Sequence, residues 1–274
     1  MAGEVEMRVG ILGCGTIGSY VLDAVLAGKV EHARVVAVAG RSKGRAKVEA
    51  VGIEWLTDPA DLVRRGLDVV VEAASHEAVE TWGASILRAG IDFIPLSLGA
   101  LVDKDLFSRL KDASTEGRSL LYIPSGGIGG LDTLQAALVA GVKTVSMTTR
   151  KPPRAWKGIP FVEALGLDLD RLAEPALLFE GPARDCVKKF PQNINIAAAL
   201  SLAGVGFDRT LIRILADPHV ESNTHEILVE AETGRFQVIL ENVPVPENPK
   251  TTYLACASAV AALRRVRSLY RAGT

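Results

Sequence analysis

Two of the four histidines in the chain, His219 and His225, lie close together in one short segment. An imidazole titrates near neutral pH, so a rigidly held histidine suits general acid/base catalysis. His225 opens a run of alternating apolar and polar residues, which predicts a strand that would fix its ring; the alternative is a half-buried structural histidine. His219 follows Pro218, which predicts an exposed turn. The spacing of the two histidines and the few acids near them favour no metal site.

Polar residues that suit anion or amide recognition precede two predicted helices. Lys250, Thr251 and Thr252 stand just before the last periodic stretch, where they would bind an anionic substrate or form an ordinary capped turn. Asn193 and Asn195 precede an alanine-rich segment, where amides cap a helix or bond a carboxamide or carboxylate. The two uses are compatible.

Two further candidates have plainer interpretations. Cys186 has basic neighbours that favour a thiolate, but a single widely spaced cysteine is more often buried and unreactive. His76 stands in the first turn of a predicted helix, where it would bond a ribose or phosphate or simply be solvated.

The clearest binding motif is a glycine pattern that follows a short apolar run near the start of the chain. Gly13 permits a tight strand-to-helix turn, Gly15 lets backbone approach a pyrophosphate, and Gly18 lets the helix pack closely on the strand. This pattern predicts that the chain binds a dinucleotide. The predicted cofactor-binding residues of this turn are Gly13, Gly15, Thr16, Ile17 and Gly18.

The end of the second predicted strand bears on the choice between NAD and NADP. NAD-binding proteins usually carry an acid there, but this chain has Arg41 and Ser42, which suit a 2′-phosphate; the alternative is that Arg41 stacks on the adenine. Small residues farther along, Ala74 and Ser75, are expected to line the nicotinamide side of the site. We therefore expect the chain to use NAD or NADP as its cofactor.

Apolar runs of strand length alternate with helical segments through the first half of the chain. This alternation predicts an α/β fold, an N-terminal Rossmann domain with a doubly wound parallel sheet. The predicted strands are Ala33–Ala39, Leu67–Ala74, Ile91–Leu96 and Ser119–Ile123, after the one that precedes Gly13. The predicted helices between them lie at Pro59–Arg65, His76–Ala89 and Asp103–Ala113.

From Pro124 a glycine-rich joint leads into a second, smaller lobe, for which half-exposed alternating strands predict an α+β substrate domain with a mostly open mixed sheet. We expect residues 1–124 to bind the dinucleotide, 125–250 to form the catalytic domain, and 251–274 to form a helix packed back on the first domain. The predicted strands here are Val142–Arg150, Ala176–Glu180, Thr210–Ala216, Thr224–Ala231 and Gly234–Leu240, with helices at Leu131–Ala140, Asp185–Phe190, Ile194–Leu202 and Thr252–Tyr270.

Composition narrows the class of partner. The 274 residues suit two domains with a cleft, and 32 acids nearly balance 31 bases, which disfavours nucleic acid and anionic membranes as partners. Three scattered cysteines argue against a disulfide framework, and no leader or long apolar span is evident. We expect a cytoplasmic protein with a small-molecule substrate.

Several segments, in matching order across nearly the whole chain, resemble the L-aspartate dehydrogenase family. The segments are G-C-G-T-I-G, E-A-A-S-H-E-A-V, P-S-G-G-I-G-G-L-D, F-P-Q-N-I-N-I-A-A, A-D-P-H-V-E-S-N-T-H-E-I and E-N-P-K-T-T. The resemblance implies oxidative deamination of L-aspartate to iminoaspartate with NAD or NADP. The imine then hydrolyses to oxaloacetate and ammonia or enters NAD biosynthesis. The resemblance also implies a homodimer.

The resemblance assigns roles to particular residues. His225 matches the family's active-site histidine, and Gly127, Asn193 and Asn195 match positions around the nicotinamide, with Gly127 standing where alanine is common. We further hypothesise that Lys250, with Thr251 and Thr252, binds one substrate carboxylate. Competing interpretations are a homoserine dehydrogenase-like or dihydrodipicolinate reductase-like enzyme, whose first lobe is similar, and a non-catalytic NAD(P)-binding sensor.

Overall fold

The computed structural model describes residues 6–190, 195–268, 270, 272 and 273. The chain divides into two compact units, Met1–Gly126 with Ala255–Arg271, and Gly127–Leu254 with Ala272–Thr274. The first unit therefore contains segments from both ends of the chain. No helix in the described ranges is long and apolar enough to cross a membrane.

The first unit is built on a parallel five-stranded sheet with the order β3-β2-β1-β4-β5. Its strands are β1 (Met7–Leu12), β2 (Ala33–Ala39), β3 (Glu54–Leu56), β4 (Val69–Glu72) and β5 (Asp92–Pro95). Its helices are α1 (Thr16–Leu26), α2 (Arg45–Ala50), α3 (His76–Arg88), α4 (Lys104–Gly117) and α9 (Tyr253–Val266), with 3-10 helices at Pro59–Arg64 and Leu98–Val102. This confirms the predicted doubly wound arrangement.

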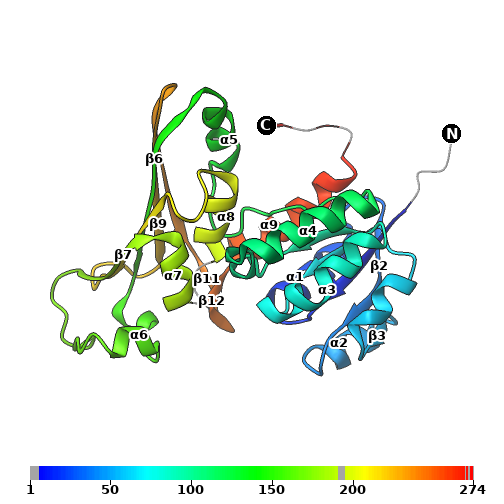
Figure 1. Cartoon of the computed structure of the whole chain (residues 1–274). Helices are drawn as coiled ribbons and strands as arrows, with labels where there is room; N and C mark the ends of the chain where they lie inside the picture. The colour runs from blue at the N-terminus through cyan, green and yellow to red at the C-terminus, as the bar shows by residue number, and fades with distance from the viewer. Residues whose placement is uncertain (1–5, 191–194, 269, 271, 274) are drawn as a thin grey trace. The chain divides into compact units, whose positions relative to one another are not determined.

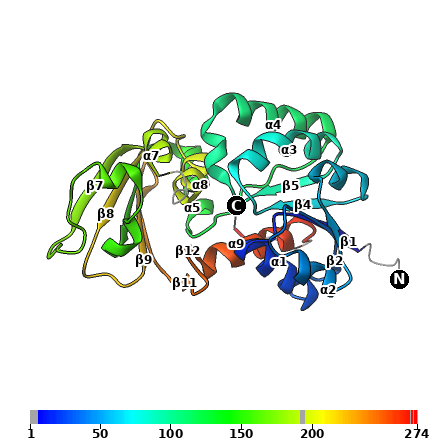
Figure 2. The same cartoon turned by 90° about the horizontal axis from the view of Figure 1, so that it is seen from below.

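Helices cover both faces of this sheet, α3 and α4 on one side and α1 and α9 on the other (Figure 2). The sheet is therefore buried on both faces, which explains why its central strands are continuous apolar runs. On the α1 side, Val9, Ile11 and Val71 pack with Leu22 and Leu263 in one core.

Two parts of the first unit differ from the sequence-based expectation. The strand predicted at Ser119–Ile123 is reduced to one isolated bridge between Leu121 and Phe93. Its side chains are half-exposed or exposed, and Pro124 follows, which has no amide hydrogen to extend a ladder. In addition, α2 and β3 were not predicted, because both are short and only partly apolar.

The second unit contains a mixed five-stranded sheet with the order β10-β9-β6-β8-β7, in which only β6 and β8 pair in parallel. Its strands are β6 (Val142–Lys151), β7 (Ala176–Pro182), β8 (Thr210–Ala216), β9 (Asn223–Ala231) and β10 (Gly234–Asn242), followed by the hairpin of β11 (Pro244–Val245) and β12 (Asn248–Thr252). Its helices are α5 (Leu131–Ala140), α6 (Pro160–Glu163), α7 (Ala183–Lys189) and α8 (Asn195–Ala203), with a 3-10 helix at Pro153–Trp156.

Helices α5, α7 and α8 lie on one face of the mixed sheet (Figure 1). Alternate residues of β6 and β9, such as Val145, Met147, Ile227 and Val229, are buried beneath them, whereas residues on the other face are partly exposed. This one-sided burial produces the alternating pattern that predicted these strands. The segment Asn248–Thr252 is strand β12 rather than the turn that the sequence suggested.

Candidate active site

The glycine-rich turn after β1 has the geometry that the motif predicts. Gly13 has φ +93°, and a Cβ on it would stand 2.6 Å from the Cβ of Ala74. A Cβ on Gly18 would stand 2.0 Å from the carbonyl oxygen of Gly13. Both positions therefore exclude side chains, and the first turn of α1, with Thr16 and Ile17, packs tightly against the loop.

Gly15 differs from its neighbours because a Cβ there would meet no atom within 4 Å. It is the N-cap of α1, and glycine has no side chain to accept hydrogen bonds from the first turn. The amide groups of that turn are thus available to an anion, and the space beside Gly15 would let a phosphate approach the backbone.

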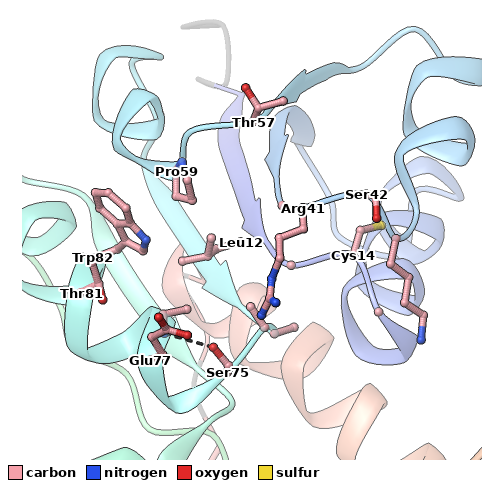
Figure 3. Close-up of a pocket in the computed structure, with 17 residues that line it drawn as sticks. Leu12, Cys14, Arg41, Ser42, Thr57, Pro59, Ser75, Glu77, Thr81 and Trp82 are labelled. Atoms are coloured by element: carbon pink, nitrogen blue, oxygen red, sulfur yellow. Dashed lines mark hydrogen bonds between the residues drawn. The ribbon is translucent and has the colours of Figure 1, made fainter.

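A pocket of about 840 Å³ opens at this turn, formed by residues of the first unit (Figure 3). Trp82 and Thr81 of α3 line it as well, although nothing in the sequence singled them out. Because the pocket joins the glycine turn to the ends of β2 and β4, it fits a dinucleotide. Six of the predicted cofactor-binding residues line it: Gly13, Gly15, Arg41, Ser42, Ala74 and Ser75.

The Arg41 side chain extends into the pocket from the end of β2 (Figure 3). Ser42 and Lys43 follow it along the pocket wall, and all three residues are exposed. The wall at this strand end therefore presents two cations and a hydroxyl. This is the charge that would favour a 2′-phosphate on the adenosine ribose.

A buried carboxylate fixes the loop that carries Ala74 and Ser75. Glu72, the last residue of β4, is 0% exposed, and its Oε1 accepts hydrogen bonds from the amides of Ala74 and Ser75 at 2.7 and 2.9 Å. Ser97 donates to the same carboxylate through its amide and its hydroxyl at 3.0 and 2.9 Å. Burial raises the pKa of Glu72, against these bonds. Glu72 thus positions the pocket wall, a role that only the folded structure reveals.

His225 lies in β9 of the second unit and is 3% exposed, on the face of the sheet that the helices cover. Its Nδ1 is 3.1 Å from Oγ1 of Thr149, which is also its register partner in β6. Burial, together with the nearby charge of Lys151, lowers the pKa of His225 to about 3. The ring is therefore neutral near pH 7, so one of its nitrogens carries a lone pair that can accept a hydrogen bond.

The buried face of this sheet becomes polar at the end where His225 lies. Asn223 and Asn242, register partners in β9 and β10, are both buried there. Asn242 donates a hydrogen bond of 2.7 Å to the carbonyl of Gly127. A Cβ on Gly127 would stand 3.4 Å from Oγ1 of Thr252. The backbone at Gly127 therefore lies against the polar side chains of Asn242 and Thr252.

The other predicted substrate and cofactor residues are spread over two elements. Lys250 is exposed on β12, Oγ1 of Thr251 accepts a hydrogen bond from the side-chain Nδ2 of Asn248 at 3.1 Å, and Thr252 is buried. Asn195 begins α8. Asn193 lies outside the described residues.

The weaker candidates take the plainer interpretations. His219 is exposed, 3.7 Å from Glu174, and Cys186 is buried with its pKa raised by that burial, which disfavours a thiolate. His76 begins α3, after Ser75 has capped the helix. Within the part of the chain that the structure describes, no three side chains of metal-ligating type cluster to hold an ion.

Lys151 is the residue of this region that sequence reasoning missed. It is the last residue of β6 and is 5% exposed, and burial lowers its pKa to about 8. Its signal in the sequence is the alternation of Val145, Met147, Thr149 and Lys151, which places a lysine on the buried face. The predicted strand ended one residue earlier, at Arg150, so the pattern was cut before this lysine.

Two family models match the chain. The C-terminal domain of aspartate dehydrogenase matches residues 132–266, and the NAD-binding domain of homoserine dehydrogenase matches residues 13–124.

Similar proteins extend over almost the full length. An L-aspartate dehydrogenase of Methanosarcina acetivorans is 41% identical over 271 residues, covering 98% of this chain and 100% of that protein. Another, of Brucella anthropi, is 38% identical and covers 95% and 96%. The crystal structure of an aspartate dehydrogenase from Thermotoga maritima superposes with a TM-score of 0.76 at 30% identity, covering 98% of this chain and 100% of that one.

Proposed function

Because this chain belongs to the aspartate dehydrogenase family, we propose that it oxidatively deaminates L-aspartate to iminoaspartate with NAD or NADP. The imine then hydrolyses to oxaloacetate and ammonia or enters NAD biosynthesis. The observation that carries the proposal is His225, a buried and neutral imidazole whose Nδ1 contacts Thr149 at 3.1 Å. A neutral imidazole keeps a lone pair on one ring nitrogen, which can accept a hydrogen bond from the amine of the substrate.

The proton balance of the reaction indicates which proton transfers His225 performs. The α-ammonium of L-aspartate must lose a proton before the α-carbon can release a hydride. Nε2 of His225 accepts that proton once the carboxylates of the substrate lie beside the ring, because a nearby negative charge raises the pKa of an imidazole. Bound NAD(P)⁺ supplies the acceptor for the hydride and its two electrons. The lone pair of the amine nitrogen then forms the carbon–nitrogen double bond of iminoaspartate. His225 can then return its proton as water adds to the imine.

His225 needs one particular tautomer for this role. If Nε2 is to accept a proton, Nδ1 must carry the ring hydrogen and donate it to Oγ1 of Thr149. Thr149 therefore orients the ring and selects the tautomer, as the third member of a catalytic triad does.

For the cofactor, we propose that Arg41 and Ser42 accommodate the 2′-phosphate of NADP, while the amides at Gly15 hold the pyrophosphate. The exposed cations on the pocket wall support this preference. Gly127, Asn193 and Asn195 are proposed to surround the nicotinamide. The bond from Asn242 that fixes the carbonyl of Gly127 supports a rigid backbone there.

For the substrate, we propose that Lys250, with Thr251 and Thr252, binds one of the two carboxylates of L-aspartate. Lys250 is exposed and so can meet a ligand, and Thr252 lies beside Gly127. The resemblance also leads us to propose a homodimer, which sedimentation analysis would test. Three buried free thiols support a reducing compartment such as the cytoplasm.

The decisive experiment follows the absorbance of reduced nicotinamide with purified protein, L-aspartate and either NAD or NADP. L-Homoserine and D-aspartate serve as control substrates. Turnover confined to L-aspartate supports the proposal. Turnover of L-homoserine would favour a homoserine dehydrogenase-like enzyme, and cofactor binding with no turnover of any substrate would favour a sensor.

A further inference from the structure

Trp82 places an aromatic ring in the wall of the dinucleotide pocket. Ser75 caps α3 by accepting a hydrogen bond from the amide of Ala78 at 3.2 Å, and Trp82 follows Ala78 by one turn on the same side of the helix. Among the 17 described residues that line the pocket, Trp82 alone is aromatic. The residues that α3 buries in the core are Val79, Gly83, Ala84, Ile86 and Leu87. Trp82 lies beside this core face and is only half-buried, so part of its ring is open to a ligand.

A proline lies on the same side of the pocket as the Trp82 ring. Pro59 is the first residue of the 3-10 helix after β3, and Asp58 caps that helix by accepting a hydrogen bond from the amide of Ala60 at 2.9 Å. This 3-10 helix contacts α3. Figure 3 shows Pro59 and Trp82 on one side of the pocket and the Arg41 side chain on the other. One side is therefore formed by two uncharged rings, and the opposite side by a cation.

The other tryptophans of the chain, both in the described ranges, lie elsewhere. Trp55 belongs to β3, and a Cβ on Gly40 would stand 3.1 Å from its ring, so Trp55 packs against the backbone at the end of β2. Trp156 is 1% exposed and belongs to the second unit. Neither residue lines the pocket. Trp82 is therefore the tryptophan that a ligand in this pocket would touch.

The rest of the pocket suits the charged parts of a dinucleotide. The amides of the turn at Gly15 suit the pyrophosphate, and Arg41 suits a phosphate on the adenosine ribose. A Rossmann domain holds that ribose at the end of its second strand, so the attached base must lie in the same part of the pocket. Adenine is flat, aromatic and uncharged. It is thus the group that gains most from the rings of Trp82 and Pro59.

We propose that the adenine of the cofactor stacks on the indole ring of Trp82, with Pro59 beside it. This inference rests on the proposed use of NAD or NADP, and it applies to both because they share the base. Trp82 then sets the affinity for the adenosine half of the cofactor and favours a purine, whose two rings cover more of the indole than a pyrimidine does. Arg41 remains available for the 2′-phosphate.

The direct test uses ADP-ribose, with or without a 2′-phosphate, because it carries the adenosine and no nicotinamide. Saturation should quench the tryptophan fluorescence of the wild type, since a stacked base quenches an indole. In Trp82→Phe the quenching should vanish, whereas the Kd from calorimetry should rise less than about 5-fold, because phenylalanine also stacks. Quenching that persists in full in Trp82→Phe would overturn the proposal.

Trp82→Leu removes the aromatic ring and keeps an apolar side chain. We expect the Kd of NADH to rise about 10- to 100-fold, and the Kd of reduced nicotinamide cytosine dinucleotide, which differs only in its base, to rise less. Phe107→Leu is the matched control, because Phe107 is a half-buried aromatic of α4 outside the pocket, with Nζ of Lys111 4.9 Å from its ring centroid. The control should bind both dinucleotides as the wild type does.

Two results with Trp82→Leu would contradict the assignment. An equal loss for both dinucleotides would place Trp82 against a group that they share, and no loss for either would remove it from the site. Failure of the proposed activity would look different. A wild type that binds ADP-ribose with quenching and oxidises no L-aspartate keeps this inference and refutes the activity, whereas a wild type that binds no dinucleotide refutes both.

Discussion

Oγ1 of Thr149 lies 3.1 Å from Nδ1 of His225, and the two residues are direct register partners in strands β6 and β9. The contact is therefore built into the pairing of the sheet and does not depend on a flexible loop. Because the backbone ladder fixes both Cα positions, the ring can turn only about its own side-chain bonds, and the hydroxyl restricts that motion.

Replacing Thr149 by valine keeps the shape of the side chain and removes the hydroxyl. We expect kcat for L-aspartate to fall by about 10- to 100-fold, with KM changed less than about 3-fold, because the ring loses its orienting partner and its preferred tautomer. Steady-state kinetics measures both constants. Thr148→Val, on the opposite face of the same strand, should behave as the wild type does. A normal kcat in Thr149→Val would remove Thr149 from the mechanism.

The buried state of His225 makes stability depend on pH. Its folded pKa of about 3 lies below the ordinary value of 6.5, so between these values the unfolded chain binds more protons than the folded one. Stability from this group is thus present above pH 6.5 and is lost as the pH falls toward 3.

Lowering the pH from 7 to 5 should therefore reduce the Tm of the wild type more than that of His225→Asn, which cannot take up the proton. Each 1 kcal/mol corresponds to about 2–4 °C in a chain of this size. Thermal melts at both pH values test this. His219→Asn removes an exposed histidine and should keep the wild-type dependence. Equal slopes for the wild type and His225→Asn would contradict a buried, neutral ring.

Two glycines of the same turn should respond to alanine in different ways. Gly15→Ala meets no atom within 4 Å, so the fold should tolerate it, whereas the added methyl group occupies the space proposed for the pyrophosphate. We expect its Tm to stay near that of the wild type and its cofactor Kd to rise about 10-fold or more.

Gly13→Ala has the opposite expectation, because its Cβ would stand 2.6 Å from Ala74 at a positive φ. Its Tm should fall by several degrees. Melting curves and cofactor titrations on both variants distinguish the two effects. Unchanged cofactor affinity in a folded Gly15→Ala would place the pyrophosphate elsewhere.

Cofactor choice should depend on Arg41. In Arg41→Ala we expect KM for NADP to rise about 10- to 100-fold and KM for NAD to change less than about 3-fold, because only NADP carries the 2′-phosphate. Arg45→Ala, in which a surface pair with Glu49 at 2.8 Å is lost, is the control. If the two constants change equally, Arg41 contacts a group that both cofactors share, such as the adenine.

Lys250→Ala should raise KM for L-aspartate about 10- to 100-fold, because the exposed amine is proposed to bind a carboxylate. Cofactor KM should remain within about 2-fold. The variant is not expected to melt earlier, since the side chain is exposed on β12. A wild-type KM for L-aspartate would exclude Lys250 from substrate binding.

The fold could be predicted where one physical pattern dominates. Ala33–Ala39 is a buried β-branched run, and the structure has β2 over the same residues. Thr210–Ala216 was likewise located correctly. Ser119–Ile123 looked similar in sequence, but its residues are only partly covered and the segment forms a single bridge. Burial, which a local pattern cannot report for short segments, made the difference.

The candidate site shows the same limit at longer range. The glycine turn was predictable because its residues are adjacent in sequence and their geometry is local. Glu72 was treated only as part of a segment of small residues, since its partner Ser97 is far along the chain. Thr149 and His225 come together only through the register of β6 and β9. Which strands pair was not evident from the sequence alone.

The division of the first unit between the two ends of the chain has a consequence for synthesis on the ribosome. Ala259, Ala262 and Leu263 of α9 complete the core that Val9 and Leu22 begin, yet they are translated only after residues 127–254 of the second unit. The intervening unit emerges whole before this core can close. A nascent chain arrested before α9 would thus carry an open apolar sheet face, which makes it a natural client for chaperones.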